Sequence, residues 1–117
     1  MAFRFEKLDI WHEANHYAHE IYEITKKFPR EELFSLSDQL KRAANSIPAN
    51  IAEGSGSTSK KDFRHFLNIA IKSAYETVSL IIRAEQEGFI TKKSRIAIYN
   101  QAEALVKRIQ SFKKTIK

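Results

Sequence analysis

The sequence contains no cysteine, and it has only three glycines and two prolines among 117 residues. Without cysteine there can be no disulfide, no thiolate metal ligand and no cysteine nucleophile. No segment approaches the roughly 20 uncharged apolar residues of a membrane-spanning helix. The first ten residues contain no apolar stretch of signal-peptide length. We therefore expect a cytoplasmic protein, without a membrane partner, whose stability comes from a hydrophobic core.

What the sequence does contain is helical periodicity, because apolar residues recur in steps of three and four along nearly the whole chain. Short connections between successive long helices make those helices antiparallel neighbours. The sequence predicts an all-α, antiparallel up-down-up-down four-helix bundle that forms a single domain over residues 1–117. The four helices are expected over residues 9–28, from residue 31 or 35 to 53, from a cap at Ser59 to 87 with Gly88 after it, and from Thr91 or Ser94 onward.

The motif HEANH, residues 12–16, has the His-Glu-x-x-His pattern that places two histidines on one zinc ion when it lies on a helix. A catalytic zinc needs three protein ligands in a walled cleft with one open position. Here His19 and Glu20 are the candidate third ligands, and they share one helix with the pair, turned away from its core stripe. We therefore expect no metal site, no cofactor and no enzymatic activity, and keep a zinc hydrolase as a remote alternative.

Polar residues interrupt the expected core of the second and third helices. Pro48 lies inside the second helix and predicts a kink. A buried glutamate without a partner would cost several kcal/mol, so a hydrogen-bonded network between the two helices is expected; the alternative is that both glutamates reach solvent at the bundle edge. The residues of this structural polar network are Arg42, Ser46, Asn50, Glu53, Ser73 and Glu76.

The third expected helix is apolar on nearly every side, whereas a helix with one face exposed to solvent has polar residues on that face. Beyond its core stripe it has a second apolar line and a third. An exposed apolar face of this kind indicates contact with another subunit, so a homo-oligomer is expected. The second line consists of Phe66, Ile69 and Leu80, and the third of Ile71, Tyr75, Val78 and Ile82.

Positive charge is concentrated in the last quarter of the chain. Residues 1–90 contain 12 Lys/Arg against 13 Asp/Glu, whereas residues 91–117 contain 8 against 1. Such asymmetry favours an anionic partner, nucleic acid first, although a solvated helix face explains it equally well. The expected phosphate contacts are Lys92, Lys93, Arg95, Lys107, Arg108, Lys113, Lys114 and Lys117.

Three segments resemble the 23S rRNA intervening-sequence protein family. They are F-x-K-L-x-x-W-x-x-A at 5–14, QLKRAANSIPANIAEG at 39–54 and F-x-x-F-L-x-I-A-x-x-S-A-x-E at 63–76. The resemblance covers residues 3–90, and the last helix is similar only in general character. This chain has Ser57 where the family frequently has arginine, and Lys60, Lys61 and Arg64 supply positive charge nearby.

The resemblance implies a small cytoplasmic bacterial four-helix bundle without enzymatic activity. The family is also similar to the accessory protein of diversity-generating retroelements, which is a basic five-fold barrel. This similarity favours a pentamer. Our first interpretation is an oligomer that binds nucleic acid, RNA in particular, through its basic surface. The alternative is an adaptor that docks a partner enzyme such as a reverse transcriptase.

Overall fold

The computed structural model describes residues 2–32 and 35–117, and four α-helices and two short 3-10 helices lie within these ranges. Residues 33 and 34 lie outside the described residues. They would be part of the second helix if it began at residue 31, the earlier of its two expected starts. The helices are η1 (Arg4–Lys7), α1 (Asp9–Thr25), η2 (Arg30–Glu32), α2 (Leu36–Ser55), α3 (Lys60–Gln86) and α4 (Lys92–Lys114).

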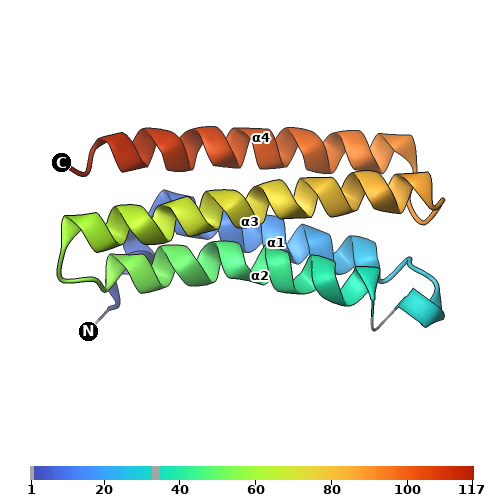
Figure 1. The fold of residues 1–117 in the computed structure, drawn as a ribbon, viewed down its shortest axis with the longest axis horizontal. Helices are drawn as coiled ribbons and strands as arrows, with labels where there is room; N and C mark the ends of the chain where they lie inside the picture. The colour runs from blue at the N-terminus through green and yellow to red at the C-terminus, as the bar shows by residue number, and fades with distance from the viewer. Residues whose placement is uncertain (1, 33–34) are drawn as a thin grey trace.

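The four long helices run alternately up and down, so the predicted bundle is confirmed (Figure 1). Each helix packs against the next one along the chain, and α4 closes the ring against α1, whereas the backbones of the diagonal pairs do not approach each other closely. The resulting rod measures 44 × 24 × 21 Å. None of the described helices has the length and apolar character needed to cross a bilayer.

Local capping interactions set both ends of α3 and the start of α4. Ser59 Oγ accepts a hydrogen bond from the Asp62 amide at 3.0 Å, and Thr91 Oγ1 accepts one from the Ser94 amide at 3.1 Å. Both satisfy amides that a helix start leaves unpaired. After α3, Gly88 has φ +80°, and the Phe89 amide donates to the Ala84 carbonyl at 2.9 Å. This is a Schellman ending, and it confirms the predicted glycine cap.

The core consists of apolar residues that recur with helical spacing along the four helices, and it also includes Pro48 and a buried pair of hydroxyl groups. Pro48 is buried inside α2, which continues through it as a helix. Tyr17 Oη lies 2.7 Å from Thr77 Oγ1 and joins α1 to α3 across the diagonal of the bundle. Thr77 Oγ1 in turn donates to the Ala74 carbonyl at 2.7 Å, so the tyrosine hydroxyl is the donor. Burial raises the pKa of Tyr17 to about 12, although the Thr77 hydrogen bond opposes that shift.

The apolar sides of α3 are partly covered within the single chain, and coverage of the rest by another subunit stays a prediction. Phe66 lies against Gly54 of α2, and Val78 lines a cleft with residues of α4. Because α3 packs against both α2 and α4, its two flanking apolar lines fill the seams with those helices. Tyr75 and Ile82 are the members that stay exposed, at 65% and 39%.

Candidate nucleic-acid interface

The eight cations predicted to contact phosphates divide into paired and unpaired residues. Arg95 Nε donates to Glu85 Oε1 at 2.6 Å, and Lys113 Nζ donates to Asn68 Oδ1 at 2.6 Å. Arg108 forms an ion pair with Glu13 of α1. These three side chains hold α4 to its neighbours. The other five have no hydrogen bond or ion pair within residues 2–32 and 35–117, namely Lys92, Lys93, Lys107, Lys114 and Lys117.

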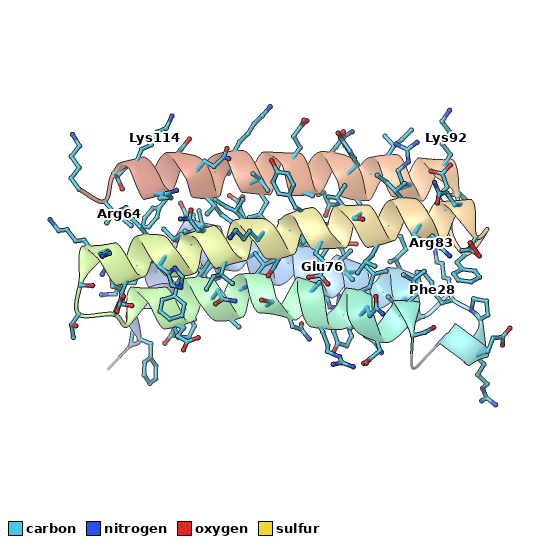
Figure 2. The ribbon with its side chains drawn as sticks, in the orientation of Figure 1. Phe28, Arg64, Glu76, Arg83, Lys92 and Lys114 are labelled. Carbon is cyan, nitrogen blue, oxygen red and sulfur yellow. The ribbon has the colours of Figure 1, made fainter. Side chains whose placement is uncertain are left out.

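Four of the unpaired cations occupy the solvent side of α4, and the fifth, Lys117, lies just after the helix. Lys107 and Lys114 are seven residues apart, so they lie on one face about 10 Å from each other along the helix axis. Lys92 lies at the opposite end of the bundle from Lys114 (Figure 2). All five are exposed, and extended side chains of this kind attract phosphates without reading sequence. Their roles as nucleic-acid contacts stay predictions.

Basic residues from distant segments of the chain join the C-terminal end of α4. Arg64 Nη1 of α3 donates to the Ile116 carbonyl at 3.0 Å, and Figure 2 shows Arg64 at the same end as Lys114. Arg4 of η1 and Lys60 of α3 line a cleft together with Lys117. Sequence reasoning noticed Lys60 and Arg64 through the family resemblance, but Arg4 carried no signal because it is 113 residues from Lys117.

The structure brings together three of the six residues expected in the polar network. Ser73 Oγ donates to Ser46 Oγ at 2.8 Å, and Asn50 Nδ2 donates to Ser46 Oγ at 2.9 Å and to the Ser46 carbonyl at 2.7 Å. This cluster links α2 to α3. It consists of neutral groups that satisfy one another at the seam, which removes the cost of placing them there.

The other three residues of the expected network lie outside it. Arg42 pairs with Asp38 one turn earlier on α2. Glu53 and Glu76 are exposed, and Figure 2 shows Glu76 midway along α3. Burial of these glutamates is therefore wrong for the single chain. The reason is their helical position, since each lies about 80° or more around its helix from the buried stripe, and a carboxylate without a partner is most stable in water.

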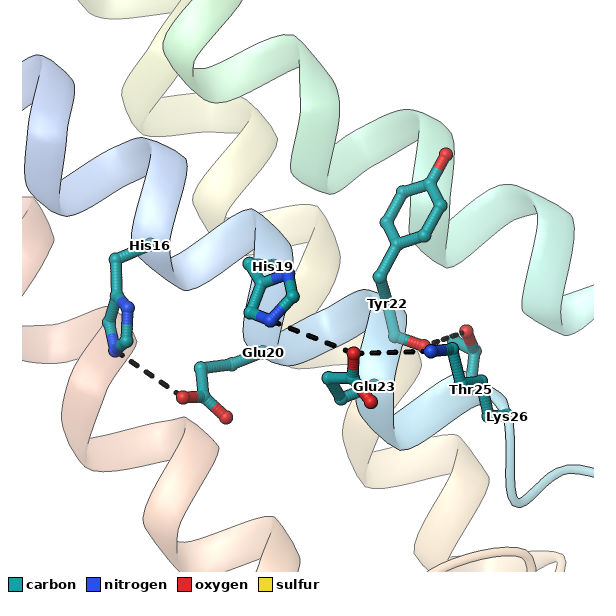
Figure 3. A network of polar contacts seen from close by, with 7 residues as sticks. All are labelled: His16, His19, Glu20, Tyr22, Glu23, Thr25 and Lys26. Atoms are coloured by element: carbon teal, nitrogen blue, oxygen red, sulfur yellow. Dashed lines mark hydrogen bonds and ion pairs between the residues drawn. The ribbon is translucent and has the colours of Figure 1, made fainter.

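The histidines of HEANH face away from the core, as predicted. His12 Nε2 lies 2.7 Å from the Glu6 carbonyl. His16 and His19 are each turned toward a carboxylate on the next turn of α1, Glu20 at 3.3 Å and Glu23 at 3.6 Å (Figure 3). No three His, Cys, Asp or Glu side chains of the described residues lie close enough together to hold a metal ion.

Comparison with known proteins decides the family. Residues 6–111 match the 23S rRNA-intervening sequence protein family. The chain belongs to this family. The family match reaches beyond the resemblance seen at residues 3–90 and takes in most of α4, so the basic helix is part of the family domain and not an appendage to it.

A solved structure extends the comparison to three dimensions. A protein of unknown function from the S23 ribosomal protein family of Bacteroides thetaiotaomicron superposes with a TM-score of 0.82. It is 30% identical to this chain, and the match covers 90% of this chain and 98% of the other. The curated proteins contain no match. The comparisons thus support a bundle of the 23S rRNA-intervening sequence protein family.

Proposed function

We propose that this protein is a non-enzymatic, homo-oligomeric bundle that binds nucleic acid, structured RNA in particular, by contacts to phosphates. The observation that carries the proposal is the set of unpaired cations on the solvent side of α4 and just after it. Three of the eight predicted cations form hydrogen bonds or ion pairs within the chain, and the remaining five are exposed lysines. Lysines in this arrangement neutralise phosphates and release counterions, which supplies affinity without base recognition.

Self-association is the second part of the proposal, and an apolar cleft between α3 and α4 supports it. The cleft has a volume of about 280 Å³ and includes Tyr75, Val78, Tyr99 and Val106. Tyr75 is 65% exposed and Tyr99 41%, and aromatic side chains of this exposure are typical of interface anchors. A closed ring of copies would repeat the α4 lysines around one axis, which raises affinity by multivalency. The family resemblance favours five copies.

The test compares RNA binding of the wild type with that of two variants, each lacking four cations. The first carries Lys92→Gln, Lys93→Gln, Lys107→Gln and Lys114→Gln, which removes only unpaired side chains of α4. The control carries Lys7→Gln, Lys27→Gln, Arg30→Gln and Lys72→Gln, which removes the same charge elsewhere. Fluorescence anisotropy with a structured RNA and a random DNA duplex is measured at several salt concentrations.

We expect the α4 variant to bind more weakly and to lose about two to three units of the slope of log affinity against log salt. The control should keep most of the slope. A wild type that binds neither nucleic acid at low salt contradicts the proposal. Equal losses in both variants would mean that only net charge matters and that α4 is not the binding surface.

The second candidate function is a protein-binding adaptor that docks a partner enzyme such as a reverse transcriptase. The same apolar cleft at Tyr75 and Tyr99 favours it, because a helix from a partner could occupy the cleft instead of another copy. Analytical ultracentrifugation separates the two uses of this surface. A monomer of about 13.6 kDa at micromolar concentration, with no RNA binding, would favour the adaptor over the proposed nucleic-acid-binding oligomer.

A further inference from the structure

The cleft at the end of the bundle differs in chemistry from the other clefts of the described residues. It has a volume of about 320 Å³ and lies between η1, the turn after α2, the start of α3 and the segment after α4. Three cations line it, Arg4, Lys60 and Lys117, and no acidic side chain does. The clefts along the α1–α4 and α3–α4 seams each include at least one glutamate.

The cations of this end cleft are available to a ligand. None of Arg4, Lys60 and Lys117 forms an ion pair within the described residues, and all three are exposed. The Arg4 guanidinium lies 5.1 Å from the centre of the Phe63 ring, a cation–π contact that positions it without neutralising it. Three positive charges therefore line one concavity that contains no acidic side chain.

The end cleft is lined by apolar side chains as well as hydroxyl groups. Phe63 and Phe112 pack edge to face with ring centres 5.7 Å apart, and Ile116 also belongs to the lining. Ser57 and Thr58 contribute hydroxyls. Cationic groups and hydroxyls beside an apolar surface suit a ligand with a phosphate joined to a less polar ring system, which describes a nucleotide.

We propose that the end cleft is a phosphate-binding site for a nucleotide unit of RNA, with the phosphate held by Arg4, Lys60 and Lys117. The sugar or base of that nucleotide packs toward Phe112 and Ile116. This inference rests on the proposed function, since it names where on the basic surface RNA is held most strongly. It adds to that function a strongest site at one end of the bundle, beside the lysines along α4, with cations from η1, the start of α3 and the segment after α4.

The test uses two triple variants with the same change in charge. The end-cleft variant carries Arg4→Gln, Lys60→Gln and Lys117→Gln. The matched variant carries Lys27→Gln, Arg30→Gln and Lys72→Gln, which are exposed cations outside both the cleft and α4. Circular dichroism verifies that each variant keeps its helices. Because Arg4→Gln also removes the contact with Phe63, the single variant Ser57→Glu is measured as well, since it places a carboxylate in the cleft and leaves every cation present.

We expect the end-cleft variant and Ser57→Glu each to weaken RNA binding by about tenfold or more at low salt, because three phosphate contacts are lost or opposed. The matched variant should weaken it by no more than about threefold. Equal losses in the two triple variants, or a normal affinity for Ser57→Glu, would overturn the inference while leaving the proposed function intact.

A second measurement separates failure of the inference from failure of the proposed function. Amide signals of residues 57–60 are followed by NMR during titration of the wild type with a nucleoside monophosphate, with inorganic phosphate, and with RNA oligonucleotides that carry or lack a terminal phosphate. Saturable shifts with the monophosphate would support the end cleft, and if long RNA did not bind in the same sample they would contradict the proposed function. No shift at residues 57–60 with any probe would overturn the inference, and the anisotropy measurement would then decide the proposed function alone.

The oligonucleotide arms identify the source of the phosphate. Equal binding with and without the terminal group would mean that the cleft holds a phosphodiester of the backbone. Binding only of the phosphorylated oligonucleotide would mean that it holds a chain end. Either result supports the site, because the same three cations would contact the phosphate in both cases.

Discussion

The seam between α2 and α3 and the seam between α1 and α4 differ in how closely the helices approach. At the first seam a Cβ atom added to Gly54 would lie 2.7 Å from Phe66 Cβ, so the two helices are in direct contact. The Ser46–Ser73 hydrogen bond crosses the same seam. At the second seam two clefts of about 450 and 360 Å³ remain, and the Glu13–Arg108 ion pair joins α1 to α4 at the first of these clefts.

The difference follows from the residues at each seam. Small and neutral polar side chains allow α2 and α3 to pack closely. Long charged side chains such as Glu20 and Arg108 line the α1–α4 seam and keep part of it open to water. The comparison indicates that the free energy of folding comes mainly from the tightly packed helices, whereas α4 carries the unpaired charge on a less closely packed side of the bundle.

Truncating a core leucine gives the largest expected effect and tests this comparison directly. Leu67 of α3 is fully buried, whereas Leu105 of α4 is 2% exposed and lines the α1–α4 cleft. Leu67→Ala should lower the free energy of unfolding by about 4 kcal/mol and Leu105→Ala by about 2 kcal/mol, because the cavity term is smaller beside an existing cleft. Urea denaturation measures both, and equal losses would remove the distinction between the seams.

The diagonal hydrogen bond between α1 and α3 should come next. Thr77→Val leaves the buried Tyr17 hydroxyl without its partner and should destabilise the protein by about 1–3 kcal/mol. Because burial raises the pKa of Tyr17 from 10.0 to about 12, the folded state keeps its proton longer than the unfolded state does. Stability is then fully present below pH 10 and declines as the pH rises toward 12.

The Tyr17→Phe variant is the control for that pH dependence. It should lose about 1 kcal/mol near neutral pH through the missing hydrogen bond, and it should lack the tyrosine contribution to the decline between pH 10 and 12. Thermal melts of wild type and variant across this interval measure the difference. Parallel curves would show that ionisation of Tyr17 does not oppose folding.

Two glycines near the end of α2 give a smaller effect and a matched pair. Gly54→Ala should destabilise by about 1–2 kcal/mol, because its new Cβ would overlap Phe66 Cβ and Phe63 Cδ1. For Gly56→Ala the nearest atom is at 3.6 Å, so it should be neutral or slightly stabilising. If both variants have the wild-type melting temperature, the seam between α2 and α3 accepts the added Cβ atom without loss of stability and is not tightly packed.

The smallest effect is expected for the histidines beside the α1–α4 cleft. His12→Ala combined with His16→Ala should change stability by less than about 0.5 kcal/mol, since both side chains are exposed. RNA binding should also be unchanged. Metal analysis of the purified wild type gives the decisive comparison, because a stoichiometric zinc that the double variant loses would restore the hydrolase alternative.

Much of the fold was predictable because its signals are local. The hydrogen bonds that start and end α3 and start α4 join residues three to five positions apart. Ser59 and Gly88 could therefore be recognised from their neighbours alone, and Thr91 was one of two expected starts of the fourth helix. The buried stripes follow from the period of the helix. Helix ends without a strong cap were less accurate, since α1 stops at Thr25 instead of Phe28.

The sequence by itself determined the helices, their order, the family and the excess charge of residues 91–117. Only the tertiary structure decided which cations are unpaired, because the partners of Arg95, Arg108 and Lys113 lie 10 to 95 residues away. It also placed Arg4 beside Lys117 and left Glu76 in solvent. The physical reason is that caps and periodicity depend on near neighbours, whereas contacts between helices depend on the rotation and spacing of each packed helix.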